Sequence, residues 1–135
     1  MALRYLLDTN TVSDLIRHPQ GTVASRISSA GENTVCTSII VAAEFRYGAE
    51  KSGSKTLRDR IDLVLSALDV VSLEPPVDRR YGEIRRRLAR QGTLIGPNDL
   101  FIAAHALALD LTIVTGNERE FARVPDLRLE NWLAA

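Results

Sequence analysis

The sequence predicts an α/β protein in which a central parallel β-sheet lies between two layers of helices. Short apolar runs rich in branched residues alternate along the chain with longer segments of helical period, which is typical of this class. The short runs are continuous rather than alternating with polar residues, as in strands that are covered on both faces. No repeat, low-complexity tract or linker divides residues 1–135, so we expect one three-layer α/β/α domain.

Five segments are expected to form the strands of the sheet. Apolar and β-branched residues dominate them, and such side chains pack well on a pleated, buried surface. The segments are Tyr5–Leu7, Val35–Thr37, Val70–Leu73, Thr112–Thr115 and, with the weakest pattern, Arg128–Glu130.

Five helices are expected between these strands. Thr9 or Asn10 can cap the first, which runs to about Arg17. Ser38 can cap the second, and Pro97 fits the first turn of the last. The other helices are predicted at Ile39–Lys51, Arg58–Leu68, Asp78–Gln91 and Asn98–Asp110.

The composition, 45% hydrophobic and 25% charged, is that of an ordinary globular protein. The apolar stretch before Asp8 is too short for a signal peptide, and no run is long enough for a transmembrane helix. Cys36 is the only cysteine, which excludes an internal disulfide and favours a buried position in a strand. We therefore expect a cytoplasmic protein.

The charge balance gives no overall preference for nucleic acid, because the formal net charge is zero. Its distribution is uneven: fifteen of the 17 basic residues are arginine, and six of these fall between Arg79 and Arg90. At 100° per residue, Arg79, Arg86 and Arg90 share one stripe of the predicted helix Asp78–Gln91. This stripe is either a solvated helix face or a surface for phosphate groups.

Polar residues gather where the predicted strands end, which is where open parallel sheets bind ligands. Asp8 ends the first strand, and Asp99 lies in the first turn of the helix that Pro97 opens. Glu44 lies in the middle of the helix that follows the second strand. The fourth strand is followed by Asn117, Glu118 and Glu120.

Such a group of acids suits a hard divalent cation. Mg²⁺ and Mn²⁺ prefer oxygen ligands, and two or three carboxylates leave positions for water and a phosphate oxygen. The bound ion can then activate the water or stabilise charge on the phosphate. With two histidines and one cysteine in the chain, a zinc site of nitrogen and sulfur ligands is disfavoured.

Each acid taken alone has an ordinary structural explanation. Asp8 and Asp99 can be acids at helix N-termini, where they interact with the helix dipole. Glu44 can be a solvated helix residue, although Val41–Phe45 is otherwise apolar. The convergence of all three on one edge of the sheet favours a metal site.

Four segments, in this order and at these spacings, resemble the VapC toxins of the PIN-domain family. The resemblance extends to Val124-Pro125 and Arg128–Trp132 and so covers nearly the whole chain. The four segments are Leu6–Asn10, Ala43–Ala49, Ile95–Asp99 and Ile113–Phe121.

The resemblance implies a three-layer PIN-like fold and a Mg²⁺-dependent endoribonuclease, with Mn²⁺ able to substitute. It implies an RNA substrate, a homodimer and a VapB-type antitoxin that holds the enzyme inactive, as in a type II toxin–antitoxin pair. Asp8, Glu44 and Asp99 correspond to the acidic metal-site residues of the family, and Thr115 to a residue that supports the site through its hydroxyl.

Asn117 departs from the family pattern, because many PIN domains have a fourth acid at this position. An amide oxygen can position water or bind a cation, but it brings no charge. Glu118 or Glu120 can supply the missing acid. This departure puts a second metal ion in doubt.

Other conspicuous residues are expected to serve packing. His105 lies six residues beyond Asp99 on the same predicted helix and therefore on a different face. Trp132 is expected to anchor the C-terminal segment rather than to stack on a base. Phe45 and Tyr47 can pack in the core or line a groove for a partner.

Three other classes of protein fit the sequence less well. A receiver-like domain needs an adjacent acidic pair early in the chain and a later lysine, but no lysine follows Lys55. A haloacid-type phosphatase needs Asp-x-Asp where this chain has Asp8-Thr9-Asn10. The remaining alternative is a PIN-like module that binds RNA or protein without cutting.

Overall fold

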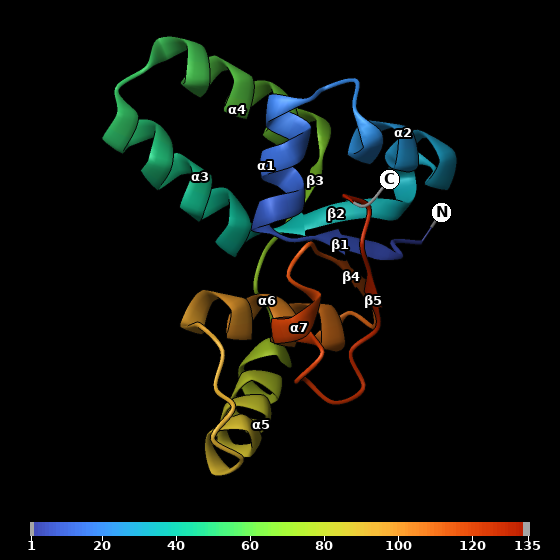
Figure 1. Cartoon of the computed structure of the whole chain (residues 1–135), viewed down its shortest axis with the longest axis vertical. Helices are drawn as coiled ribbons and strands as arrows, with labels where there is room; N and C mark the ends of the chain where they lie inside the picture. The colour runs from blue at the N-terminus through green and yellow to red at the C-terminus, as the bar shows by residue number, and fades with distance from the viewer. Residues whose placement is uncertain (1, 134–135) are drawn as a thin grey trace.

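The computed structural model describes residues 2–133 and contains the central sheet and two helical layers that the sequence predicts (Figure 1). Within these residues the five strands all run parallel, in the order β3-β2-β1-β4-β5. The strands are β1 (Tyr5–Leu7), β2 (Val35–Ser38), β3 (Asp69–Val71), β4 (Thr112–Val114) and β5 (Leu129–Glu130).

The helices cover the two faces of the sheet in two groups. The first four lie above it in Figure 1, and the last three lie below. Parallel strands joined by right-handed crossovers require this division, because the chain moves one way across the sheet from β1 to β3 and then the other way. The helices are α1 (Thr9–Arg17), α2 (Thr22–Ala30), α3 (Ile39–Ser52), α4 (Lys55–Ala67), α5 (Val77–Arg90), α6 (Pro97–Ala108) and α7 (Glu118–Phe121).

The central position of β1 explains its sequence. Its two neighbours pair with it along its whole length, Leu7 with Thr37 of β2 and with Val114 of β4. Helices cover both faces, so Leu6 and Leu7 have no exposed surface. The hydroxyl of Thr37 donates to the carbonyl of Leu7 at 2.8 Å, which satisfies a polar group inside the core. The continuous apolar pattern therefore correctly predicted that Leu6 and Leu7 are buried.

The predicted elements are all present, and their bounds differ from the prediction by at most three residues. The largest difference is in α4, which begins at Lys55 because the side chain of Ser54 caps it and accepts the backbone N–H of Leu57 at 3.2 Å. The third strand is Asp69–Val71 rather than Val70–Leu73.

Two helices and one short turn were not predicted. In α2 only Val23 is buried, so the helix carries almost no apolar periodicity. α7 has four residues, which is too few for a periodic pattern. A single 3₁₀ turn, Glu32–Thr34, leads into β2.

The predicted packing roles of Cys36 and Trp132 are confirmed. Cys36 is buried in β2, and burial together with the charge of Asp69 raises the pKa of its thiol to about 12. The ring of Trp132 packs edge-on against Tyr5 with centroids 5.0 Å apart, and its Nε1–H donates to Glu130 at 2.9 Å. Among residues 2–133, no helix is long and apolar enough to cross a membrane.

We expect Trp132→Ala to lower the free energy of unfolding by about 3–5 kcal/mol, because it empties a large buried site. Urea unfolding followed by circular dichroism measures the change. Leu63→Ala is the control, since Leu63 is 73% exposed and its truncation should change stability by no more than about 0.5 kcal/mol. Equal effects of the two substitutions would contradict the anchoring role of Trp132.

Candidate active site

The candidate site lies where β1 and β4 end side by side. The strand order reverses its direction at β1, and such a switch point opens a crevice beyond the carboxyl ends of the strands. Asp8 follows β1, and Thr115 follows β4. The backbone N–H of Asp8 donates to the carbonyl of Val114 at 3.0 Å, which extends the sheet ladder by one bond. The fold thus brings two predicted site residues, 107 positions apart, into contact.

Asp8 is a buried carboxylate with fixed partners, and only 3% of it is exposed. It caps α1, since its Oδ1 accepts the backbone N–H of Thr11 at 2.9 Å, and its Oδ2 accepts the hydroxyl of Thr115. Burial raises the pKa of Asp8, and these hydrogen bonds oppose only part of that rise. Asp8 therefore acts as a helix cap and also belongs to the acidic cluster.

Thr115 connects Asp8 to the segment after β4. Its hydroxyl donates to Asp8 and accepts the backbone N–H of Asn117 at 2.8 Å. Thr115 is completely buried, and its own backbone N–H donates to the carbonyl of Glu130 at 2.9 Å. The hydroxyl is thus held between two fixed groups and directs its hydrogen at the carboxylate.

Glu44 reaches the same region from α3. It is half-buried, and its Oε1 accepts the hydroxyl of Thr9 at 3.0 Å. Thr9 follows Asp8 directly, so this bond ties α3 to the start of α1. Sequence reasoning named Thr9 as a possible helix cap and missed this contact, which depends on how α3 lies against α1.

Asp99 lies in the first turn of α6 and is half-buried. The pKa of Asp99 is raised to about 7, first by burial and then by the carboxylates of Glu120, Asp8 and Glu44. Asp99 also hydrogen-bonds to Glu120, and this bond helps to raise the pKa of Asp99 and to lower the pKa of Glu120. The effect of these three carboxylates on Asp99 indicates that the four acids form one cluster.

Glu120, rather than Glu118, is the additional acid of this cluster. Burial alone would raise the pKa of Glu120, but hydrogen bonds from the backbone of Gly96 and from Asn117 and Asp99 outweigh it and lower the pKa. Gly96 N–H lies 3.2 Å from its Oε1, and the Asn117 amide donates to Oε2. Glu118 instead accepts the side-chain amide of Asn131 at 3.1 Å.

The cluster is not a closed cage. Among residues 2–133, no three His, Cys, Asp or Glu side chains are arranged so that they could enclose a metal ion. The acids are close enough to shift the pKa of Asp99, and the Asp99–Glu120 hydrogen bond holds two of them together. All donors are oxygens, which is the chemistry that Mg²⁺ and Mn²⁺ require.

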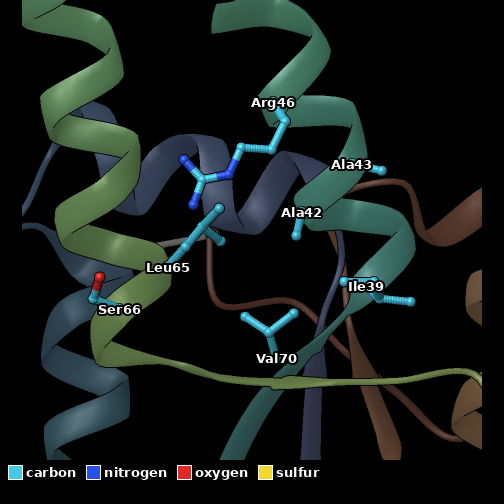
Figure 2. A pocket seen from close by; sticks show the side chains of 7 residues that line it. All are labelled: Ile39, Ala42, Ala43, Arg46, Leu65, Ser66 and Val70. Carbon is cyan, nitrogen blue, oxygen red and sulfur yellow. The ribbon is translucent and has the colours of Figure 1, made fainter.

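An apolar surface borders the cluster. A pocket of about 310 Å³ lies between α3, α4 and β3 (Figure 2) and contains none of the predicted acids. A second hollow, of about 260 Å³, adjoins Glu44, and Ala43 lines both. The first is lined by Ile39, Ala42, Ala43, Arg46, Leu65, Ser66 and Val70, and the second by Ile40, Ala43, Glu44, Tyr47 and Asn98.

His105 lies outside the cluster, as the helical spacing predicts. It is 1% exposed, and its Nδ1 lies 2.9 Å from the hydroxyl of Ser38, which caps α3. Burial lowers the pKa of His105. Of the two aromatic residues whose role the sequence left open, Phe45 packs against the core and Tyr47 is 68% exposed.

Comparison with known proteins assigns the chain to a family. The sequence model described as "PIN domain" matches residues 5–127. The chain belongs to the PIN-domain family. Within this family it is similar to ribonuclease VapC2 of Rickettsia felis, with 42% identity over 95% of this chain and 97% of the relative.

This PIN domain also resembles a protein from Salmonella typhimurium that is named tRNA(fMet)-specific endonuclease VapC. The two are 37% identical over 96% of this chain and 98% of the relative. Among solved structures, the complex of VapBC2 from Rickettsia felis bound to a promoter DNA fragment matches with a TM-score of 0.89. That match has 39% identity and covers 98% of this chain and 99% of the other. The chain therefore belongs to the VapC ribonucleases.

The raised pKa of Asp99 should make the stability of this PIN domain depend on pH in EDTA. An unfolded aspartate titrates near 3.8, whereas folded Asp99 titrates at about 7. Between these values the folded state binds more protons, so the free energy of unfolding falls as pH rises. Glu120 acts oppositely, but its contribution is already present above its ordinary pKa of 4.5.

Urea unfolding between pH 5 and 8 measures this dependence, and Asp99→Asn should reduce the slope. Asp78→Asn is a matched control in the first turn of α5, where the side chain is exposed, and it should keep the wild-type slope. The same slope in Asp99→Asn and in the wild type would show that Asp99 does not carry the effect.

Proposed function

We propose that this PIN domain, residues 1–135, is the endoribonuclease toxin of a type II toxin–antitoxin pair and acts in the cytoplasm. The observation that carries the proposal is the convergence of Asp8, Glu44 and Asp99 at the carboxyl ends of β1 and β4. A structural role explains one capping acid. It does not explain why three acids from separate elements lie close enough for the charges of Asp8 and Glu44 to raise the pKa of Asp99.

The same three acids are proposed to hold the metal ion. Their oxygen donors and mutual repulsion fit a hard divalent cation, Mg²⁺ or, in its place, Mn²⁺. When bound, such an ion activates water and offsets the negative charge that develops on the phosphate. Because the pKa of Asp99 is raised, cation binding at this carboxylate competes with its protonation.

Neighbouring residues are proposed to hold these acids in position. The hydroxyl of Thr115 occupies one side of the Asp8 carboxylate and fixes its orientation. Asn117 replaces the fourth acid of many family members, and we propose that it acts through its amide, which holds Glu120 beside Asp99. In this arrangement Glu120 supplies the negative charge that Asn117 lacks.

RNA is the proposed substrate, since the relatives are named as ribonucleases. The name of the Salmonella relative makes initiator tRNA the first substrate to test.

The proposed partners are a VapB-type antitoxin and a second copy of the chain. The apolar pocket of Figure 2 and the hollow beside Glu44 share Ala43, so one extended segment can cross both. We propose that an antitoxin segment fills this surface and directs a basic side chain at the acidic cluster, where uncompensated carboxylates attract such a donor.

Asp8→Asn, Glu44→Gln and Asp99→Asn should each lower the rate of RNA cleavage at least ~100-fold, the scale of losing one fixed electrostatic group. Wild-type cleavage should require Mg²⁺ or Mn²⁺ and stop in EDTA. Cleavage of tRNA followed on denaturing gels measures both effects.

Glu50→Gln is the matched control, because Glu50 is exposed on the same helix as Glu44. It should cleave at the wild-type rate. Thr115→Val and Asn117→Ala test the supporting residues and should lower the rate less than loss of an acid. Near wild-type cleavage by Asp8→Asn would contradict the assignment of Asp8 to the metal site. It would favour a PIN-like module that binds RNA or protein without cutting.

Ile39→Asp should weaken antitoxin binding about 10- to 100-fold, because it removes an apolar contact from the pocket of Figure 2. An acid at the first turn of α3 is compatible with the helix. Leu63→Asp, also exposed but outside the pocket lining, should bind normally. Co-purification with the product of the neighbouring antitoxin gene is the measurement, and normal binding by Ile39→Asp would exclude this surface.

A further inference from the structure

One face of α5 carries arginines directly opposite its buried side. Val77, Ile84 and Leu88 are buried, and Tyr81 stacks on Phe101 of α6 with ring centroids 4.2 Å apart. At 100° per residue, Arg79, Arg86 and Arg90 fall within about 40° of one another on the opposite side, and Arg87 lies beside them. Figure 1 shows α5 at the end of the molecule, away from α3 and α4.

Among residues 2–133, four of the six arginines of α5 have no side-chain partner. Arg80 pairs with Glu83 at 3.5 Å, and Arg85 donates to the hydroxyl of Tyr81 at 2.8 Å. The other four are exposed, and within residues 2–133 their side chains make no hydrogen bond or ion pair. We call them the arginine surface: Arg79, Arg86, Arg87 and Arg90.

Part of the arginine surface lines a hollow, and the like charges of its guanidinium groups repel one another. Arg86, Arg87 and Arg90 line a shallow pocket of about 510 Å³ together with Glu83 and Gln91. Arg86 and Arg90 are one helical turn apart, a spacing at which like charges destabilise a helix. The helix has six arginines and two acids in a chain whose net charge is zero. A bound polyanion would relieve this repulsion.

The arginine surface adjoins the acidic cluster along the chain. From Arg90 the chain passes through residues 91–96 to Pro97, and Asp99 lies in the next turn. Seven residues of extended chain span at most about 25 Å. A nucleic acid strand bound at Arg90 therefore lies within a few nucleotides of the cluster.

The cluster itself cannot supply the affinity for a polyanion. Without a bound cation its carboxylates repel phosphate groups, so the free energy of RNA binding must then come largely from another surface. Arginine presents a planar fork that matches phosphate oxygens, and phosphate contacts dominate nucleic acid affinity.

We propose that the arginine surface binds the phosphate backbone of RNA beside the cleavage site. This inference rests on the proposed ribonuclease function, and it assigns the substrate-holding role to Arg79, Arg86, Arg87 and Arg90. Contact with the backbone carries no sequence information, so the surface positions RNA without selecting it.

The test is the binding of single-stranded RNA by Arg86→Glu/Arg90→Glu, measured by fluorescence anisotropy across a range of salt concentrations. EDTA is present, so the result does not depend on cleavage. We expect the Kd to rise at least 10-fold. The slope of log affinity against log salt should flatten by about 1.4, or 0.7 for each lost contact. Arg58→Glu/Arg60→Glu is the control with the same charge change on α4, and it should bind more tightly than the α5 variant.

Arg86→Gln/Arg90→Gln removes the charges without reversing them and should flatten the slope equally, which guards against a misfolded variant. An unchanged slope in both α5 variants would overturn the proposal. So would loss of antitoxin binding with normal RNA binding, since the surface would then be a protein interface. If the wild-type protein binds RNA through these arginines but never cleaves it, the proposed ribonuclease function is wrong. The proposed RNA-binding role of the arginine surface would still hold.

Discussion

The hydrogen bond between Thr115 and Asp8 is the contact on which the candidate site depends. A carboxylate buried to this extent is unfavourable unless donors surround it. The fold supplies two, the backbone N–H of Thr11 at the start of α1 and the hydroxyl of Thr115 at the end of β4. Because these donors come from opposite ends of the chain, Asp8 is satisfied only when β1 and β4 are adjacent.

The other acids depend on this arrangement in turn. The bond from Thr9 to Glu44 starts from the residue next to Asp8, and the backbone bond from Asn117 to Thr115 starts the segment that carries Glu120. Glu120 then holds Asp99 through a shared hydrogen bond. One buried carboxylate therefore fixes the positions of two neighbouring segments, which bring the remaining acids to it.

The sequence was sufficient to predict those elements whose structure is determined by one local pattern. Continuous apolar runs predicted β1 and β4, and the polar residues at strand ends and helix starts predicted Asp8, Asp99 and Asn117 at one edge. The role of Thr115 was predicted only from the family resemblance. Local patterns failed for α2, where a single buried side chain leaves no periodicity. They also left Glu118 and Glu120 equivalent, because both follow β4 and only the position of Gly96 and Asp99 distinguishes them.

The distribution of the acids along the chain has a consequence for synthesis on the ribosome. Asp8, Glu44 and Asp99 are separated by dozens of residues, and the Thr115 donor and Glu120 lie beyond the last of them. Domains form from the N-terminus as the nascent chain emerges, but this cluster cannot close until β4 and α7 have left the exit tunnel. A truncated product that ends before Thr115 therefore lacks the donor that holds Asp8.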